Sequence, residues 1–462
     1  MEKIEIAILD NGVDESVLTL CELPIVIHYN KETVDDNGNL FLHGTNCAII
    51  IGMNCANVQL YSYKILDNSG KGSVTALKSA FEWCLSNGIR LVNLSFGTTH
   101  FKDKSVIRQI VNHYANKGFI IVAATANSGY TSFPASISSV IGVRYGDTFG
   151  IDDESLRDRG VDFTAPSEHK FQLAGENIIL QKSNSYAAPY VTAIIGRLLK
   201  EQSTKNVWQI KKRLYQKLGK ECVQYIPDWI EKGWIDGKAL GSRADVYFEM
   251  VERAEDADTV ILYDLKELEK YHDKHIVYLG REVTEEPDTQ YFFWSRKNRE
   301  KQILCSRVKR ENDDIPILIL RVDNGQDVIW WLTELRKYFE AEGYNAYTAS
   351  SQTESVLYDL EYIPLDTDES VRNKICDFMY WQTYYNQSDL IIYGIKESNK
   401  ESFGRYADVL IKVGNKGEKT DIQVYCDGIE RTQVEFKAVG EKEIRKLFDQ
   451  LLGFLTEDEN EQ

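Results

Sequence analysis

The chain has 462 residues, enough for two or three domains with hydrophobic cores, and its 43% hydrophobic and 27% charged residues are typical of a globular protein. Its net charge of −17 argues against nucleic acid and anionic membranes as partners, because both attract cationic proteins. The start, MEKIEIAILD, has no long apolar segment, so we expect neither export nor a membrane anchor. The eight cysteines lack Cys-x-x-Cys spacing, which favours reduced thiols in the cytoplasm.

Short apolar runs alternate with helical patterns along the first 200 residues. The runs predict strands at 4–9, 58–65, 91–96, 119–125 and 139–145, and the helical patterns lie near 43–54, 73–87 and 103–117. Strands separated by such helices indicate an α/β fold with a doubly wound, mostly parallel sheet. Functional residues gather at the carboxyl ends of parallel strands. The residues directly after each strand are therefore the candidates for a site.

Two candidates occur early in the chain. Asp10 ends the first strand, where a carboxylate can orient a histidine, although Asp-Asn-Gly is also ordinary turn chemistry. His43 begins a helical pattern, and its imidazole can accept a proton near neutral pH. A surface or capping histidine explains His43 equally well when that stretch is taken alone.

Further candidates follow the later strands. Ser95, Phe96 and Gly97 end the third strand, where exposed backbone can pair with an extended peptide. Asn127 follows the fourth strand, and its amide can donate to a developing oxyanion or simply form a turn. Ser185 opens an apolar helix with a proline in its first turn, so it is either a nucleophile or a helix cap.

The order of these stretches is more specific than any one of them. The chain reads Asp, His-Gly-Thr, Ser-x-Gly, Asn and Ser-x-Ala-x-Pro, and over about residues 4–218 it resembles the subtilisin-like serine proteases, the S8 peptidase family. The resemblance implies a Ser-His-Asp triad, an oxyanion donor and a substrate-binding strand, and it implies no cofactor. Carried over by position, the triad is Asp10, His43 and Ser185, the oxyanion donor is Asn127, and the substrate strand is Ser95, Phe96 and Gly97. Calcium is common in the family, but no loop here has EF-hand spacing, so we expect no metal site.

Several residues depart from the family pattern. Ser183-Asn184-Ser185-Tyr186 stands where Gly-Thr-Ser-Met is usual, Ala126 stands for a glycine, and Asn46 stands for a histidine. The segment from Asn127 to Pro134, which forms a wall of the substrate pocket in the family, is short, and hardly any chain precedes Asp10. None of these departures removes a triad member. They favour a selective cytoplasmic protease without a pro-segment.

The second half of the chain has a different organisation. A helix at 207–219 closes a protease domain, which we place at 1–220, and a connecting α+β region follows at 221–314. We expect strands at 259–265 and 274–280 and a hairpin within 281–305 in this region. A second α/β domain covers 315–455, and an acidic tail covers 456–462. The patterns of the second domain predict strands at 315–322, 388–395, 407–414, 420–428 and 432–440, and helices at 324–344 and 441–454.

The second domain looks like a P-loop fold without its phosphate loop. Its first strand continues as RVDNGQDV, which lacks the lysine and the glycine cradle that hold phosphates. We therefore expect this domain to recognise a peptide or a partner protein. The aromatic cluster at 378–387 fits a hydrophobic core, or else an exposed partner surface.

These features together predict a selective serine endopeptidase that forms an acyl-enzyme with peptide or protein substrates. The arrangement of a compact protease with an added α/β domain resembles proteases that remove leader segments in bacterial peptide maturation. Two alternatives remain: a catalytically silent peptide-binding scaffold, and an intracellular or defence protease that its C-terminal domain regulates.

Overall fold

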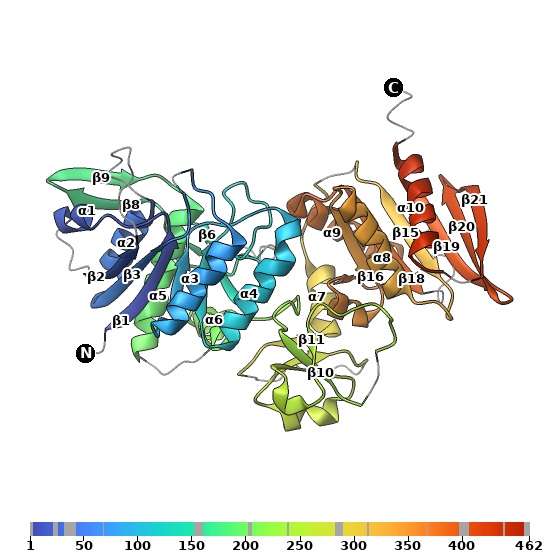
Figure 1. The fold of residues 1–462 in the computed structure, drawn as a ribbon, viewed down its shortest axis with the longest axis horizontal. Coiled ribbons are helices and arrows are strands. Elements are labelled where there is room, and N and C mark those ends of the chain that lie inside the picture. Colours follow the sequence, from blue (N-terminus) through green and yellow to red (C-terminus); the bar gives the residue numbers. More distant parts are fainter. Residues whose placement is uncertain are drawn as a thin grey trace. The chain divides into compact units, whose positions relative to one another are not determined.

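The structure is a computed structural model that describes residues 3–21, 26–31, 43–67, 69–151, 160–201, 206–237, 240–281, 290–311, 314–366, 368–396, 406–437 and 439–456 (Figure 1). The chain divides into two compact units. Unit 1 comprises 1–224 together with 228–231 and 290–292, and unit 2 comprises 225–227, 232–289 and 293–462. None of the helices in the described ranges is long and apolar enough to cross a bilayer.

Unit 1 is built on a seven-stranded sheet in the order β2-β3-β1-β4-β5-β6-β7, and all of its strand pairs are parallel. Every residue of β4 and β5 is buried, as expected for strands covered on both faces. The strands are β1 (Ile4–Asp10), β2 (Val26–Lys31), β3 (Val58–Lys64), β4 (Leu91–Leu94), β5 (Ile120–Ala124), β6 (Val140–Tyr145) and β7 (Phe163–Ala165). The five strands predicted in this region are confirmed to within two residues at each end.

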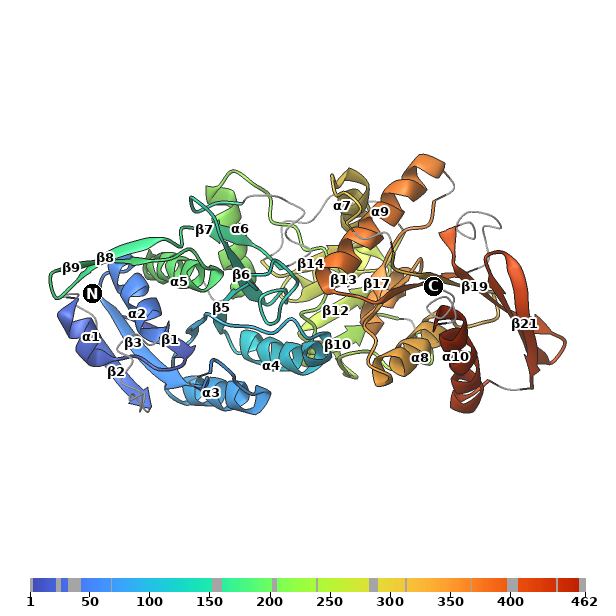
Figure 2. The same ribbon diagram turned by 90° about the horizontal axis from the view of Figure 1, so that it is seen from above.

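Helices cover both faces of this sheet, with α3 and α4 on one face and α2 and α5 on the other (Figure 2). The helices of unit 1 are α1 (Glu15–Leu20), α2 (His43–Asn54), α3 (Val74–Ser86), α4 (Lys104–Asn116), α5 (Asn184–Glu201) and α6 (Val207–Lys217). The fold class is therefore the expected α/β class. The sequence patterns did not reveal α1, β2, β7 or the antiparallel hairpin of β8 (His169–Leu173) and β9 (Glu176–Leu180).

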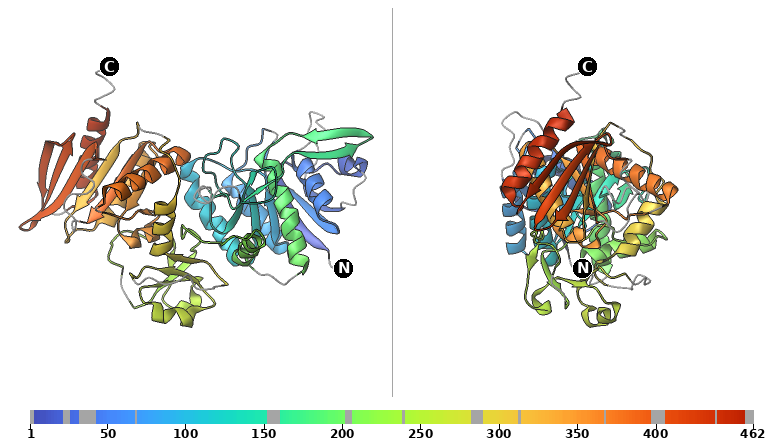
Figure 3. Two further views of the ribbon diagram at one scale, coloured as in Figure 1. Left: turned by 180° about the vertical axis from the view of Figure 1, so that it is seen from behind. Right: turned by 90° about the vertical axis from the view of Figure 1, so that its right-hand side faces the viewer.

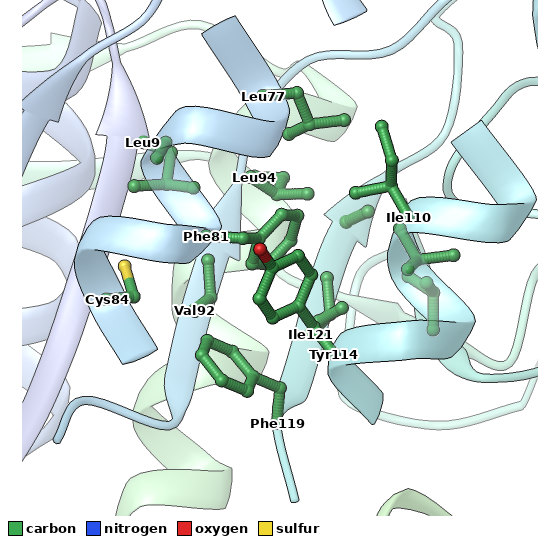
Figure 4. Close-up of a cluster of buried hydrophobic side chains, with 14 of the residues drawn as sticks. Leu9, Leu77, Phe81, Cys84, Val92, Leu94, Ile110, Tyr114, Phe119 and Ile121 are labelled. Carbon is green, nitrogen blue, oxygen red and sulfur yellow. The ribbon is translucent and has the colours of Figure 1, made fainter. Parts of the chain in front are cut away.

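The core beneath α3 and α4 is aromatic at its centre (Figure 4). Phe81 of α3 stacks on Tyr114 of α4 with ring centroids 4.9 Å apart, and Phe119 meets both rings edge-on. Aliphatic side chains from one face of the central strands, such as Leu9 and Val92, fill the space around them. This packing holds the sheet in place, and the candidate site lies at the carboxyl ends of its strands.

Unit 1 extends past the boundary expected at residue 220. Trp229 is 1% exposed and stacks on Phe292 with ring centroids 4.8 Å apart, while Phe292 also packs on Trp208 of α6. The buried carboxylate of Asp228 accepts a hydrogen bond from Ser138 N at 3.0 Å, and burial raises the pKa of this carboxyl group. Two short segments from beyond the closing helix therefore complete the core of unit 1.

Unit 2 contains two sheets. The first is parallel, in the order β11-β10-β12-β13-β14, and the second has the order β17-β16-β18-β15-β19-β20-β21, in which only the pairs β19-β20 and β20-β21 are antiparallel. The first sheet comprises β10 (Lys232–Ile235), β11 (Glu249–Met250), β12 (Thr259–Leu262), β13 (His275–Tyr278) and β14 (Phe293–Ser295). The second comprises β15 (Ile317–Val322), β16 (Ala346–Ser350), β17 (Glu361–Tyr362), β18 (Leu390–Lys396), β19 (Val409–Lys416), β20 (Lys419–Cys426) and β21 (Ile429–Phe436).

The hairpin expected within 281–305 is wrong for the described residues. Strand β14 pairs in parallel with β13, and α7 (Arg296–Cys305) follows it directly. Ser295 caps that helix by accepting a hydrogen bond from Asn298 N. The aromatic residues before Ser295 favour a strand, so the sequence analysis did not recognise the helix start. Residues 282–289 of the expected hairpin, and 457–462 of the expected tail, lie outside the described residues.

Three helices pack on the larger sheet of unit 2: α8 (Val328–Ala341), α9 (Glu369–Asn386) and α10 (Glu441–Thr456). Helix α10 lies beside β19–β21 (Figure 3). It packs against α8, where Phe448 contacts Tyr338 and Phe339. The aromatic cluster at 378–387 belongs to α9 and is mostly core, although Tyr384 is 37% exposed. In the loop after β15, Asp327 caps α8 and accepts hydrogen bonds from Ser242 Oγ and Arg243 N.

Candidate active site

Asp10 ends β1 at the carboxyl edge of the unit 1 sheet. Its side chain is 1% exposed, and its Oδ1 accepts a hydrogen bond from Asn11 N at 2.8 Å. The Nδ1 atom of His43 lies 3.0 Å from Oδ1 and 2.9 Å from Oδ2 of this carboxylate. With Asp10 ionised, His43 therefore carries its proton on Nδ1, which leaves Nε2 free to accept one.

The loop after β1 and the start of α2 interlock, and this fixes the position of His43. A Cβ atom on Gly44 would lie 2.4 Å from the carbonyl oxygen of Gly12, so only glycine allows this approach. Gly44 N donates to Asn11 Oδ1 at 3.0 Å, and Asp14 N donates to Thr45 Oγ1 at 2.8 Å. These two hydrogen bonds join residues that are 33 and 31 positions apart in the sequence. They hold the loop that follows β1 against the His-Gly-Thr stretch.

The environment of His43 suits a general base. Burial alone would lower the pKa of His43, but the hydrogen bond and the negative charge of Asp10 outweigh it and raise the pKa above its ordinary value. The side chain of His43 is about one-third exposed, so one edge of the ring remains open to a substrate. A base whose pKa lies near neutral pH transfers protons efficiently in both directions.

Ser185 is the second residue of α5, and its neighbour Asn184 anchors it to the sheet. Asn184 is buried; its Oδ1 accepts a hydrogen bond from Tyr145 N, and its Nδ2 donates to Ala126 O at 2.9 Å and to Thr125 O at 3.2 Å. The start of α5 is therefore tied to the ends of β5 and β6. The sequence analysis did not recognise this role, although Asn184 stands beside the candidate nucleophile.

Pro189 lies deeper in α5 than expected. It is the sixth residue of the helix, not a first-turn residue, because the helix begins at Asn184. Since proline has no N–H group, the carbonyl of Ser185 receives no helical hydrogen bond from position 189. The Sγ atom of Cys47 lies 3.3 Å from Ser95 Oγ and 4.0 Å from this carbonyl oxygen, so both oxygens are within reach of the thiol as acceptors.

Tyr186, the residue after Ser185, contacts the imidazole of His43. The phenol ring of Tyr186 lies on the imidazole of His43, with centroids 5.3 Å apart and 22° between the planes. The hydroxyl of Ser185 forms no hydrogen bond with His43 Nε2 in the described structure. Such bonds are often long in free serine and cysteine peptidases and shorten when the substrate binds.

Asn127 lies three residues after the end of β5, beside the start of α5. Its Oδ1 accepts a hydrogen bond from Asn184 N at 2.9 Å, and its Nδ2 lies 3.3 Å from Ser183 Oγ. The backbone N–H of Ser185 points at the same Ser183 oxygen, also at 3.3 Å. The Asn127 amide and the Ser185 N–H therefore converge on one point beside Ser185, as oxyanion donors must.

The expected substrate strand follows β4. The side chain of Ser95 is buried and accepts a hydrogen bond from Asn93 Nδ2 at 3.0 Å, while Phe96 packs against the core beneath α3 and α4. Gly97 passes so close to Phe133 that a Cβ atom would lie 2.8 Å from the Phe133 carbonyl oxygen. The side chains of Ser95 and Phe96 therefore face inward, and a role in substrate binding remains a prediction for the backbone of this segment.

Cys47 is a residue of the site that the sequence analysis missed. Among the described residues, one group has the donor atoms for a metal ion, namely Asp10, His43 and Cys47, with atoms within 4.8 Å of one another. Burial raises the pKa of the Cys47 thiol well above its ordinary value, and His43 Nδ1 is already bonded to Asp10. A metal ion would have to deprotonate the thiol and break the Asp10–His43 hydrogen bond.

A doubly wound parallel sheet with an aspartate, a histidine, a serine and an asparagine at its carboxyl edge is typical of the subtilisin-like serine peptidases. Comparison with known proteins agrees, because a sequence profile of the Subtilase family matches residues 2–228. Residues 2–228 are thus similar to the Subtilase family.

Individual relatives match a similar share of the chain. It is 27% identical to the minor extracellular protease Epr of Bacillus subtilis (strain 168) and 26% identical to subtilisin DY of Bacillus licheniformis, with 46% of this chain covered in each case. Thermitase of Thermoactinomyces vulgaris is 29% identical over 44% of this chain. The matched region spans 34% of Epr, 82% of subtilisin DY and 77% of thermitase.

Two solved structures also align with part of the chain. One is described as a cold adapted subtilisin-like serine proteinase, with 22% identity and a TM-score of 0.36, and covers 45% of this chain and 79% of its own. The other is described as a lanthipeptide protease, with 17% identity and a TM-score of 0.37, and covers 46% of this chain and 79% of its own.

Proposed function

We propose that the chain is a selective serine endopeptidase that hydrolyses peptide bonds through an acyl-enzyme at Ser185. The observation that carries this proposal is the pair of contacts between His43 Nδ1 and the buried carboxylate of Asp10, at the edge of the sheet where α5 presents Ser185. In such an arrangement Asp10 orients the imidazole and stabilises its protonated form. The subtilase match of residues 2–228 supports the same reaction.

The proposed reaction starts with His43. Its Nε2 atom takes the proton of Ser185 Oγ while that oxygen attacks the carbonyl carbon of the scissile bond. The Asn127 amide and the Ser185 N–H donate to the oxygen that becomes negative. His43 then gives its proton to the leaving amine, and water repeats the sequence to release the acyl group.

The narrower proposal is that the substrate is a precursor peptide from which a leader segment is removed. It rests on selectivity features of this chain: Tyr186 covers one face of His43, and Ala126 adds a methyl group beside Asn127 where relatives have glycine. A further support is the presence of a second α/β unit, which can recognise a substrate away from the scissile bond. Incubation with precursor peptides encoded near its gene, followed by mass spectrometry, tests this narrower proposal.

We also propose that the chain works in the cytoplasm. None of the eight cysteines forms a disulfide in the described structure, and six of them are buried, which is compatible with a reducing compartment. Fractionation of the native cells, with an antibody against the full chain, tests this location. Recovery from the culture medium would contradict it.

An activity probe tests the central proposal without knowledge of the substrate. An alkyl fluorophosphonate should label the full chain at Ser185, and Ser185→Ala should remove the label while the far-ultraviolet circular dichroism stays unchanged. Labelling at another serine would overturn the nucleophile assignment. A folded wild-type chain that takes no label would favour a peptide-binding scaffold.

A further inference from the structure

Tyr186 and Asn46 form a contact that neither the fold nor the proposed reaction requires. Asn46 Nδ2 donates to the Tyr186 hydroxyl oxygen at 3.2 Å, across 140 residues of sequence. The Asn46 side chain is buried and lies on α2, one turn after His43. These two residues stand at positions where the family usually has histidine and methionine, so the two departures meet in space.

This contact holds the phenol ring against the imidazole. Tyr186 is fixed at its hydroxyl by Asn46 and at its backbone carbonyl by His169 Nε2, which lies 3.0 Å away. The ring planes of Tyr186 and His43 differ by 22°, with centroids 5.3 Å apart. An aromatic ring fixed at both ends restricts rotation of the imidazole about its bond to Cβ.

The stacked ring also affects the charge that His43 acquires. When Ser185 Oγ attacks, its proton passes to His43 Nε2 and the imidazole becomes a cation. The face of a phenol ring carries negative charge density and attracts a cation within about 6 Å of its centroid. The titratable groups that face this imidazole are Asp10 from β1, Cys47 from α2 and Tyr186 from α5. Burial raises the pKa of Tyr186, so its phenol stays neutral while His43 titrates.

We propose that Tyr186, held by Asn46, is a positioning residue that fixes the imidazole plane of His43 and stabilises the imidazolium formed when Ser185 loses its proton. This inference rests on the proposed peptidase function and adds a pair of residues particular to this chain. It assigns the two residues one joint role, in which Asn46 acts through Tyr186.

The test measures the rate of labelling by an alkyl fluorophosphonate as a function of pH, on the full chain. Tyr186→Leu removes the ring, and we expect labelling to slow by about tenfold because the charge stabilisation and the fixed plane are both lost. Tyr186→Phe keeps the ring and loses only the hydroxyl, so labelling should slow by about threefold or less. Tyr61→Leu is the matched control, because that ring is half-buried like Tyr186 but packs on Trp83 and not on His43.

A double-mutant cycle tests the coupling between the two residues. Asn46→Ala should slow labelling as much as Tyr186→Phe, and the double variant should lose no more than either single variant. Additive losses would show that Asn46 acts independently of the phenol, and would overturn the joint role.

The pKa of His43 supplies a readout that a purely structural role would not move. Nuclear magnetic resonance of the imidazole, in full chains labelled with ¹⁵N-histidine, should show a pKa lower by about half a unit in Tyr186→Leu and unchanged in Tyr186→Phe. An unchanged pKa in Tyr186→Leu, together with a labelling rate within twofold of wild type, would overturn the inference and leave the proposed function standing. Absence of labelling in the folded wild-type chain would overturn the proposed function and this inference with it.

Discussion

The hydroxyl oxygen of Ser183 lies 3.3 Å from the side-chain nitrogen of Asn127. The same oxygen accepts a hydrogen bond from Ser185 N at 3.3 Å, so it occupies the point where the two oxyanion donors meet. A substrate carbonyl must displace this hydroxyl before it can use both donors. Family members with glycine at this position have no such occupant, which makes Ser183 a feature of this chain.

Replacing Ser183 by glycine should therefore tighten the binding of a peptide aldehyde, which forms an oxyanion with Ser185. We expect a gain of about threefold to tenfold, because one or two weak hydrogen bonds no longer have to be broken. Inhibition constants for wild type, Ser183→Gly and Ser183→Thr would measure the effect, with threonine as the control that keeps a hydroxyl. Glycine is also a fair helix cap, so stability should fall by only a few tenths of a kcal/mol. Weaker binding in Ser183→Gly would show that the hydroxyl helps to hold the oxyanion.

Asn127 has two separable tasks, and two substitutions distinguish them. Its Nδ2 faces the oxyanion position, and its Oδ1 accepts a hydrogen bond from Asn184 N. Asn127→Ala should lower kcat by about 10²–10³ with little change in KM, since the amide acts mainly in the transition state. Asn127→Asp keeps the acceptor, so it should preserve thermal stability while lowering kcat at least as much. A change in KM alone would mean that Asn127 binds the ground state.

The pH dependence of activity should follow the Asp10–His43 pair. The base works in its neutral form, and Asp10 raises the pKa of His43, so kcat/KM should fall as the pH drops through a value above the ordinary histidine pKa. Asp10→Asn removes the charge and leaves the opposing effect of burial, so this acid limb should move to lower pH. The same substitution should lower kcat by about 10³–10⁴, because the imidazole loses its orienting acceptor. A limb that stays in place would show that another group controls the titration.

Cys47 should resist alkylation in spite of its place beside His43. It is fully buried, and burial raises the pKa of its thiol, so the reactive thiolate is scarce. Treatment of the folded chain with iodoacetamide at pH 8 should modify the exposed Cys305 and spare Cys47. Peptide mass mapping would measure both sites, and treatment in denaturant is the control. Rapid loss of activity together with modification of Cys47 would contradict this expectation.

Trp229 should be a stability determinant of unit 1 although it follows the closing helix. It is buried against Phe292, and Trp→Ala substitutions in cores destabilise by about 3–5 kcal/mol. Trp229→Ala should therefore lower the free energy of unfolding of unit 1 by this amount in denaturant titrations of the full chain. Trp330 of α8, in unit 2, supplies the control substitution. An equal free energy of unfolding of unit 1 in wild type and Trp229→Ala would show that Trp229 contributes nothing to the stability of the core.

The sequence predicted the sheet of unit 1 well because its central strands are buried on both faces. The runs at 119–125 and 139–145 are continuous and apolar, and they became β5 and β6. The hairpin β8–β9 escaped prediction because it carries Lys170, Gln172 and Glu176 and turns through Ala174 and Gly175, both with positive φ. Helix α9 was not predicted because its buried residues lie around much of the helix, so the sequence shows no clear helical period.

For the candidate site, local order in the sequence was enough to name residues but not their contacts. The Asp10–His43 contact could be anticipated because two strand–helix units bring their ends to one edge of the sheet. The contacts of Asn46 with Tyr186, and of Asn184 with Ala126, span 140 and 58 residues, and side-chain placement over such distances depends on the whole fold. The competition of Ser183 for the amide of Asn127 depends on a rotamer, which no spacing rule supplies.

The return of Gln290–Phe292 to the core of unit 1 has a consequence for synthesis. Unit 1 lacks its last packing residues until the ribosome has also made residues 232–289, which belong to unit 2. At roughly 5–20 residues per second, this interval lasts several seconds on a translating ribosome. During that time Phe292, on which Trp208 and Trp229 pack, has not yet been synthesised. The nascent chain thus carries Asp10, His43 and Ser185 well before Phe292 is available to complete the core around Trp208 and Trp229.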